Sequence, residues 1–414
     1  MKLPALWRDT LKKHLLTTTA AIAMIGGAAN AQEWDLAWGG FYNADALYND
    51  TSGNGLPSNQ DLDGFALNTN AEIIFTPSVT LDNGLTFGIN VQLEANTSGD
   101  QIDESYVTIS SDTMGRVEIG SENSAGYKMM TGAPSAGFGI NSPSPSAYHP
   151  TGFVTTSGFF RNAFGSTATE VAANNDSMRI SYYTPSFNGF TAGVSYSPNQ
   201  GDDGAGLVNR NGLSDIFDLG LAYNQSFGNV DLSLSARWGT GDAGQTLAFV
   251  ANPGGLPSTA VFAPTAIQQD DPETWGVGAQ IAVAGFTFGG AYAENDAGTV
   301  VAGPGGAPFA NGVGDSEGWH LGMTYDMGNG WTIGLDGFNG EQSVVNTGVL
   351  KLKDEYQAYQ IGAERSLGAG VAWRVYAIQS ELSTSANAPN FFAPGVSKLK
   401  TESTTIGTGI TMSF

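Results

Sequence analysis

The last ten residues, Thr405–Phe414, read T-I-G-T-G-I-T-M-S-F. Ile406, Ile410 and Met412 share the parity of Phe414, whereas the odd-numbered positions carry threonine, glycine or serine. Successive side chains of a β-strand point to opposite faces, so this stretch predicts a strand with one apolar face and one small, polar face. A membrane β-barrel has this pattern because lipid surrounds it and water fills it.

The same alternation recurs along the chain. Between residues 85 and 95, every odd position is apolar and every even position is polar or glycine. The pattern predicts further strands at 230–238, 275–283, 286–292, 319–325 and 331–335, and less regular ones at 178–183 and 356–364. Counting such segments predicts sixteen strands.

Short turns and long loops alternate between these segments. Seven short turns contain Gly and Asn, as at 227–229 and 326–330, while eight long loops such as 239–271 and 294–314 are rich in Gly, Pro, Asn and Asp. Gly and Asn adopt the positive φ that tight hairpins need. Strict alternation places all turns on one side of a membrane and all loops on the other. We therefore expect an all-β fold, a transmembrane antiparallel up-and-down β-barrel of about 16 strands.

The N-terminus has the pattern of a cleaved signal peptide. A basic start precedes a modestly apolar run at 15–25 that is too short to span a bilayer, and Ala29-Asn30-Ala31 matches a cleavage site. We expect a signal peptide at 1–31 and a barrel domain at 32–414. An uncleaved anchor is the alternative.

Composition narrows the function classes. Removal of 1–31 takes away four basic residues and one acid, which leaves 12 Lys and Arg against 38 Asp and Glu, a net charge of about −26. Such a balance argues against nucleic acid as a partner, because phosphates require a basic face. The exported chain has no cysteine and hence no disulfide framework. Closed backbone hydrogen bonding would hold it instead.

Charge and aromatic positions favour a membrane barrel over a soluble all-β protein, which is the alternative reading of the alternation. Charged residues fall on the polar parity of their strands, and a Lys or Arg facing mid-bilayer lipid would cost about 2–4 kcal/mol. Arg365 is the exception, and it adjoins a turn from which it could reach the interface. Trp and Tyr on the apolar parity gather near segment ends, as Tyr48, Trp238, Trp275 and Tyr292 do.

One interval breaks the pattern, because no alternating segment lies between Ile119 and Met178. The loop at about 121–176 is rich in Gly, Pro and aromatic residues, including Phe159-Phe160. Loops of this length are functional or disordered, and this one has too many aromatic residues for a disordered tail. We expect it to fold into the lumen.

The sequence blocks on either side of this loop resemble a known family. Residues 103–120 read D-E-S-Y-V-T-I-S-S-D-T-M-G-R-V-E-I-G, and 177–196 read S-M-R-I-S-Y-Y-T-P-S-F-N-G-F-T-A-G-V-S-Y. Both resemble blocks of Gram-negative general porins, in an alphaproteobacterial style, and Phe414 fits that family. The resemblance implies a sixteen-stranded trimeric pore in the outer membrane, whose third loop narrows the lumen.

The family pattern of loop acids facing wall cations is matched only in part. Early strands carry Glu72, Glu94 and Glu104 where the family places Arg or Lys. The full set of candidate pore-lining or constriction residues is Glu72, Glu94, Glu104, Arg116, Glu122, Arg161, Arg179, Arg237 and Arg374. The arginines are either constriction residues or lumen residues paired with wall acids, and the three early acids are either a cation-favouring lining or a scattered polar face.

Other chemistry has little support. Asp61-x-Asp63-Gly64 resembles the start of a calcium loop but lacks the closing Glu. Only His149 and His320 remain after the signal, and no nucleophile, zinc or phosphate-binding motif occurs. We expect no enzyme activity, no cofactor and no specific metal.

These observations favour a water-filled channel for passive diffusion of small hydrophilic solutes and ions, with a mild cation preference. One alternative is a substrate-selective channel for sugars or anions, which a ladder of lumenal aromatic residues would favour. Tyr106, Phe338 and Tyr376 lie on the polar parity but are too scattered to form such a ladder. Another is a structural or adhesive surface barrel with a plugged pore. The expected partners are two further copies in a homotrimer, outer-membrane lipid and lipopolysaccharide.

Overall fold

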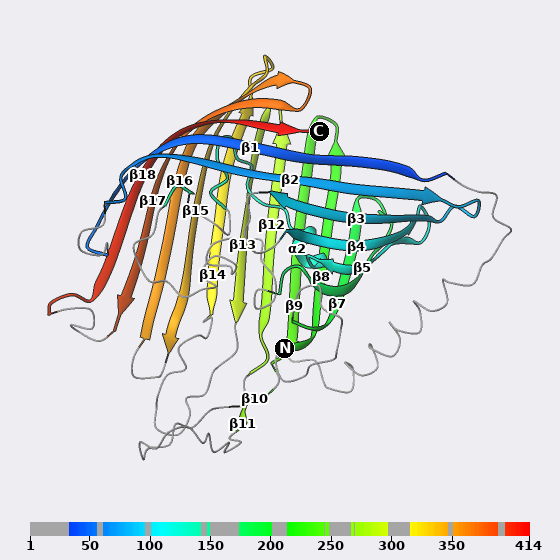
Figure 1. The fold of residues 1–414 in the computed structure, drawn as a ribbon, viewed down its shortest axis with the longest axis horizontal. Coiled ribbons are helices and arrows are strands. Elements are labelled where there is room, and N and C mark those ends of the chain that lie inside the picture. Colours follow the sequence, from blue (N-terminus) through cyan, green and yellow to red (C-terminus); the bar gives the residue numbers. More distant parts are fainter. Residues whose placement is uncertain are drawn as a thin grey trace.

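The computed structural model describes residues 33–55, 61–95, 101–141, 147–149, 174–200, 213–243, 245–247, 266–268, 270–296, 315–346, 351–387 and 394–414. The expected signal peptide and Arg161 lie outside these ranges. In the described part, sixteen antiparallel strands form one closed barrel, so the predicted fold class and strand number are confirmed (Figure 1).

The barrel strands follow one another as a meander. They are β1 (Asp35–Ser52), β2 (Gly64–Thr80), β3 (Thr86–Ala95), β4 (Ile102–Ser111), β5 (Gly115–Glu122), β6 (Ser177–Tyr183), β7 (Phe190–Asn199), β8 (Ser214–Phe227), β9 (Val230–Asp242), β12 (Glu273–Val283), β13 (Phe286–Asp296), β14 (Ser316–Asp326), β15 (Trp331–Asn346), β16 (Lys351–Gly368), β17 (Val371–Ala386) and β18 (Lys398–Ser413). Each pairs with its neighbours in the chain, and β1 pairs with β18.

The C-terminal stretch closes the barrel. β18 pairs with β1 from Phe41↔Ser413 to Ser52↔Glu402. Beyond this register, the backbone N–H of Gly40 donates to the carbonyl of Phe414 and that of Phe414 donates to Gly40, both at 3.1 Å. Closure leaves no unpaired sheet edge, which is what a strand structure needs in lipid.

Several strands are longer than their apolar pattern predicts. β15 continues to Asn346 and β16 begins at Lys351, whereas the alternation predicted strands only at 331–335 and 356–364. The long connection between β9 and β12 contains a small two-stranded sheet, β10 (Gln245–Leu247) and β11 (Ala266–Gln268). The third loop contains a short helix, α2 (Ala125–Lys128), which the strand pattern could not predict. No helix in the described part is long and apolar enough to cross a membrane.

The outer face is apolar and ringed by aromatic side chains. Leu67 is 75% exposed and Ile406 is 64% exposed, as lipid-facing residues are. Trp331 packs against Trp373 at 5.6 Å near the short turns, and Arg365 lies over the Trp331 ring at 5.5 Å. The outward Arg365 therefore lies at the expected interface rather than at mid-bilayer.

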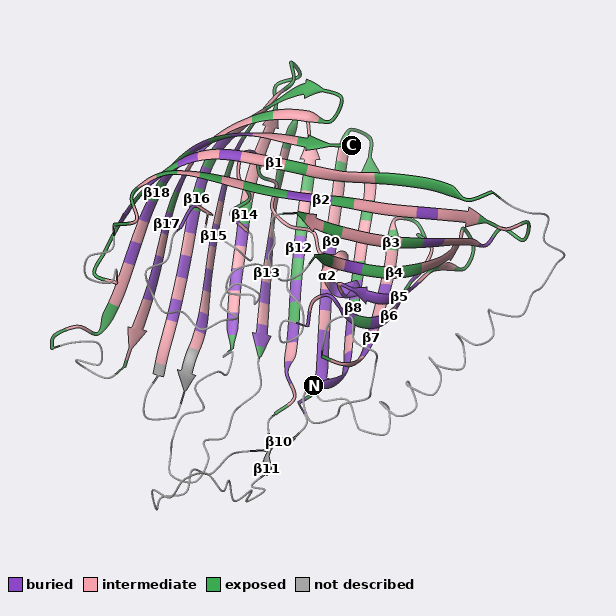
Figure 2. Cartoon of the chain, viewed as in Figure 1, coloured by how far each residue is buried: buried purple, intermediate pink, exposed green. Residues whose placement is uncertain are grey.

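Buried and exposed residues alternate along the strands, as Figure 2 shows clearly on β16 to β18. In β18, Thr401, Ser403 and Thr405 are buried and face inward, while Ile406 faces outward. The third loop accounts for this burial, because its described residues contact inward-facing side chains of the wall. Examples are the bonds from Thr405 to the Tyr148 carbonyl and from the Thr131 N–H to Ser235.

Candidate functional site

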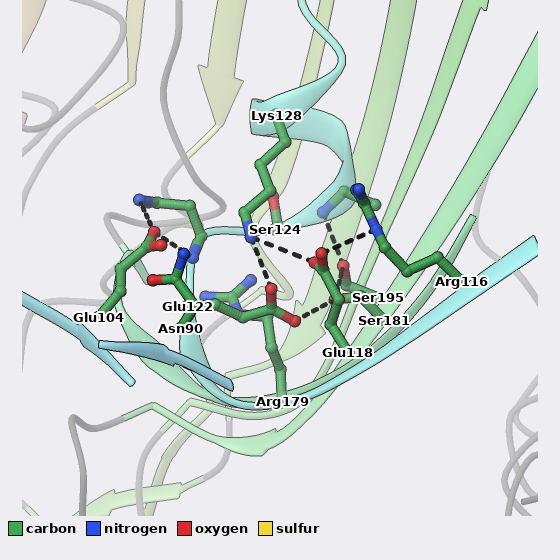
Figure 3. A network of polar contacts seen from close by, with 12 residues as sticks. Asn90, Glu104, Arg116, Glu118, Glu122, Ser124, Lys128, Arg179, Ser181 and Ser195 are labelled. Carbon is green, nitrogen blue, oxygen red and sulfur yellow. Dashed lines mark hydrogen bonds and ion pairs between the residues drawn. The ribbon is translucent and has the colours of Figure 1, made fainter. Parts of the chain in front are cut away.

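The third loop is fixed to the wall where it leaves β5. Ser124 caps α2 by accepting a hydrogen bond from the Tyr127 N–H at 3.2 Å. The Ala125 N–H donates to Ser195 of β7 at 2.6 Å, and the Ser195 hydroxyl meets that of Ser181 at 2.9 Å. The helix start is thus tied to two neighbouring strands, which turns the following residues inward (Figure 3).

Lys128 joins the loop to β5 by ion pairs. Its Nζ lies 2.6 Å from Glu122 and 3.2 Å from Glu118, and Figure 3 shows it pointing down between these carboxylates. Burial alone would lower the pKa of Lys128, but Glu122 and Glu118 raise it well above its usual value. Glu122 also accepts from Ser181 at 2.7 Å. The loop cation is therefore charged, and two acids balance it.

Aromatic rings flank this network. Lys128 lies 4.4 Å from the ring centre of Tyr106, and Arg116 lies 4.6 Å from that of Tyr183. Arg116 also pairs with Glu118 at 2.9 Å while half of its side chain stays exposed. A cavity of about 880 Å³ opens beside these groups, lined among others by Thr86, Ser110, Arg116, Lys128 and Asn224.

The other predicted arginines hold parts of the structure together. Arg179 donates to the carbonyls of Ser177, at 3.2 Å, and of Asn174. Arg237 pairs with Asp218 at 2.7 Å, and both side chains are buried. Arg374 contacts Asp45 with two nitrogens, at 2.9 and 2.5 Å, and donates to the loop carbonyl of Gly137 at 3.1 Å. The charges of Arg237 and Arg374 are thus locally balanced.

The three early acids lack such partners. Glu104 is buried and accepts from neutral groups only, namely Gln92 at 2.7 Å and Asn123 at 2.7 and 3.1 Å. Glu72 of β2 stands opposite Glu94 of β3 in the strand register. Among the described residues, no ion pair involves Glu72, Glu94 or Glu104. Carboxylates of the inner wall without an ion-pair partner therefore include those on β2 to β4.

Further along, the loop lies against inward-facing glycines. A Cβ on Gly278, Gly322 or Gly362 would meet a carbonyl oxygen of the loop well inside van der Waals contact. Side-chain bonds reinforce the approach, because Ser135 donates to Asp336 at 3.0 Å and the Phe138 N–H donates to Gln360 at 2.8 Å. The glycines form a shallow groove in which the loop backbone follows the wall.

An apolar cluster inside the barrel fastens the far part of the loop. Ile140 and Tyr148 are fully buried against Phe338, Tyr356 and Tyr376. The Tyr356 hydroxyl donates to that of Tyr148 at 2.8 Å. Phe338 and Tyr376, two of the three scattered aromatic residues on the polar parity, are buried in this contact and present no row to the lumen.

His149 completes the cluster. It is fully buried, and its ring nitrogens lie 2.7 Å from the Ser380 hydroxyl and 3.0 Å from that of Thr401. Burial lowers the pKa of His149 to about 4, so the imidazole is neutral near pH 7. His320 of β14 is also buried and contacts Asp336 at 3.1 Å.

Sequence reasoning missed the acids that balance the cations. Glu118 lies two residues after Arg116 and has the same strand parity as Arg116 and Glu122. Strand alternation could therefore have identified Glu118 as an inward acid beside Arg116. Asp45 and Asp218 lie in other strands than their arginine partners, and only the barrel register brings them together. Asp336 is buried beneath the loop, where it accepts a hydrogen bond from Ser135.

The described residues offer no metal centre. No group of three or more His, Cys, Asp or Glu in this part of the chain is placed to hold a metal ion. Asp61 and Asp63 instead accept backbone N–H groups of Asp63 and Thr51, at 3.0 and 2.6 Å. The arrangement is a charged, hydrogen-bonded wall around a lumen.

A closed sixteen-stranded barrel with an apolar outside, a polar inside and a loop against its inner wall is the architecture of outer-membrane porins. The family model of Gram-negative porins matches residues 17–385. The chain therefore belongs to the Gram-negative porin family, whose members are non-enzymatic channels for passive diffusion. No curated protein matches it closely.

Solved structures share the fold at low identity. The anion-selective porin of Comamonas acidovorans is 18% identical with a TM-score of 0.52, over 92% of this chain and all of that one. The trimer form of OmpT from Vibrio cholerae is 14% identical with a TM-score of 0.54, over 92% and 99%. The channel DcaP of Acinetobacter baumannii is 12% identical with a TM-score of 0.53, over 94% and 99%. These similarities concern the fold alone.

Proposed function

We propose that this porin is a general-diffusion channel for small hydrophilic solutes with a mild preference for cations. Solutes would pass between the third loop and the inner wall of β2 to β5, with the loop at about 121–176 setting the size limit. The contacts of the described loop residues, 131–141 and 147–149, support this path. They run along β9 and β12 to β18 and reach β1 at Asn49.

The distribution of lumenal charge carries the selectivity proposal. Lys128, Arg237 and Arg374 are each balanced by a carboxylate. Glu72, Glu94 and Glu104 take part in no ion pair in the described part of the chain, and acidic side chains along a pore favour cations. The net charge of the whole chain points the same way, although acids in the outer loops contribute to it.

A reversal potential in a potassium chloride gradient tests the proposal. Purified channels in a planar bilayer should show greater permeability to potassium than to chloride. Combined Glu72→Gln and Glu94→Gln substitution should reduce this ratio, whereas Asp231→Asn, at a lumenal acid near a short turn, should leave it unchanged. A reversal potential showing anion preference in the native chain would refute cation preference.

The alternatives predict different transport. A sugar- or anion-selective channel requires a row of lumenal contacts, but Phe338 and Tyr376 hold the loop and Tyr106 lies beside Lys128. A plugged adhesive barrel would pass nothing in a liposome-swelling assay. Swelling by sugars of increasing size therefore separates a general channel from both.

The assembly and the membrane partners belong to the same proposal. A homotrimer in contact with outer-membrane lipid and lipopolysaccharide is supported by the family and by the length of the strands. β5 and β6 have 8 and 7 residues, fewer than the about 9–11 that a tilted strand needs to span a bilayer. In a trimer, a second copy of the chain would cover the outward face of these two short strands. A cleaved signal peptide at 1–31 and an alphaproteobacterial origin remain predictions from the sequence.

A further inference from the structure

Three lumen-facing residues stand in one row across β1, β2 and β3. Phe41 is the register partner of Glu72, and Glu72 is the register partner of Glu94. Directly opposite residues in antiparallel strands share a face, with Cβ atoms about 4.5–5.5 Å apart. An aromatic ring and two carboxylates therefore lie side by side on the inner wall.

In this row, Glu72 carries a buried carboxyl oxygen without a hydrogen-bond partner. Its side chain is nine-tenths buried, with the residue 9% exposed, and its Oε1 has no hydrogen-bond partner. A buried carboxyl oxygen without a partner is unfavourable, and such an atom indicates a missing water, ion or ligand.

Two neighbouring amide side chains are already engaged. Glu104 of β4 uses Gln92 and Asn123, so these amides are already engaged with a carboxylate. Glu94 is half-buried and takes part in no ion pair of the described part of the chain. The wall thus presents three carboxylates, one of which has an oxygen without a hydrogen-bond partner.

The geometry favours an organic cation over a metal ion. Calcium and magnesium need about six or more oxygen ligands converging at about 2.0–2.6 Å, and no described acids are grouped for this. An alkylammonium is larger, donates up to three hydrogen bonds and is attracted to the face of an aromatic ring. Phe41 beside Glu72 supplies that ring.

We propose that Phe41, Glu72 and Glu94 form a subsite for small organic ammonium ions. One ammonium group would lie between the two carboxylates beside Phe41, and the second group of a diamine would extend toward Glu104. The inference rests on the proposed function, because it assigns a preferred solute class to the cation-favouring wall of the same channel.

Block of single channels by butane-1,4-diamine tests the subsite. The diamine should reduce the potassium current in a concentration-dependent manner, whereas butane-1,4-diol at equal concentration should not. Glu72→Gln and Glu94→Gln should each weaken the block about tenfold or more, as expected for loss of a hydrogen bond to a charged group. Phe41→Leu should weaken it about threefold. Asp231→Asn is the matched control and should retain full block.

The outcomes separate the subsite from the channel itself. An open channel whose potassium current the diamine does not reduce would overturn the subsite and leave the diffusion function intact. Absence of any channel would refute the function as well. Block by magnesium chloride at lower concentration than by the diamine would also overturn the proposal, because it would identify a metal site. Undiminished block by the diamine in both glutamine variants would likewise overturn the proposed subsite.

Discussion

At the scale of single residues, the absence of a side chain matters as much as its presence. Gly362 of β16 faces inward, and a Cβ there would lie 2.8 Å from the carbonyl carbon of Ala136 and 3.1 Å from the Cα of Gly137. The loop backbone can approach the wall this closely only because the wall carries no side chain at that point. The glycine content of the inner face therefore determines how the third loop lies.

Gly362→Ala should displace the third loop. Overpacking of this kind costs about 1–3 kcal/mol, and the loop can yield more easily than the hydrogen-bonded sheet. We expect a folded barrel with a noisier single-channel current and faster proteolysis of the loop. Gly132→Ala is the control, since a Cβ on this loop residue meets no atom within 4 Å. Equal currents in the two variants would show that the glycine is not needed for docking.

Strand parity predicts which way a side chain points but not its partner. The inward direction of Arg116, Arg179, Arg237 and Arg374 follows from alternation in the sequence. Their contacts do not, because Arg374 meets Asp45 across 329 positions of sequence and Phe138 meets Gln360 across 222. Such pairs depend on barrel closure and on the path of the loop, which leave no local pattern.

At the scale of elements, the alternating pattern locates the strands but not their ends. Alternation requires lipid on one side, so it fades where a strand extends beyond the bilayer and both faces meet water. The outward residues Glu341, Lys353 and Glu355 illustrate this, because they form ion pairs at 2.5 and 3.8 Å on strands that continue past the apolar band. The hydrogen-bonded ladder continues there although the hydrophobic signal has ended.

The docked part of the loop should be sensitive to acid through His149. Docking keeps the imidazole neutral, with its pKa lowered from 6.5 to about 4 by burial. A released loop would take up a proton below about pH 6.5 while the docked loop would not. Docking therefore weakens as the pH falls from about 6.5 to 4, by about 3 kcal/mol at most, and no further below pH 4.

Limited proteolysis of the loop across this pH range measures the effect. Cleavage of the native chain should increase toward pH 4. His149→Gln retains groups that can bond to Ser380 and Thr401 but does not titrate, so its cleavage should change less with pH. A native chain and a glutamine variant with the same pH profile would exclude the histidine as the cause.

At the scale of the whole molecule, the barrel wall is uneven. β15 to β18 have 16 to 18 residues, whereas β3 to β6 have 7 to 10, and Figure 1 shows the contrast in length. On the outward face around β9 and β13, girdle aromatic residues donate hydrogen bonds to acids. Trp238 donates to Glu273 at 2.7 Å and Tyr292 donates to Glu317 at 2.6 Å. The outward residues of β4 and β5 are smaller, among them Ser105, Val107 and Ile119. The aromatic face around β9 and β13 therefore suits lipid, and the outward face of β4 and β5 suits contact with another protein chain.

Val107→Trp should therefore disrupt the proposed trimer without unfolding the barrel. Val107 points outward from β4 and is 42% exposed in the single chain, so a tryptophan there is compatible with lipid but too large for a packed protein contact. Leu221→Trp is the matched control, because Leu221 points outward from β8 and is 49% exposed. On unheated gels the control should migrate as a trimer and the Val107 variant as a folded monomer, and both should unfold on heating. Loss of the trimer in the Leu221 variant alone would place the contact on the other side of the barrel, and retention in both would exclude β4 from it.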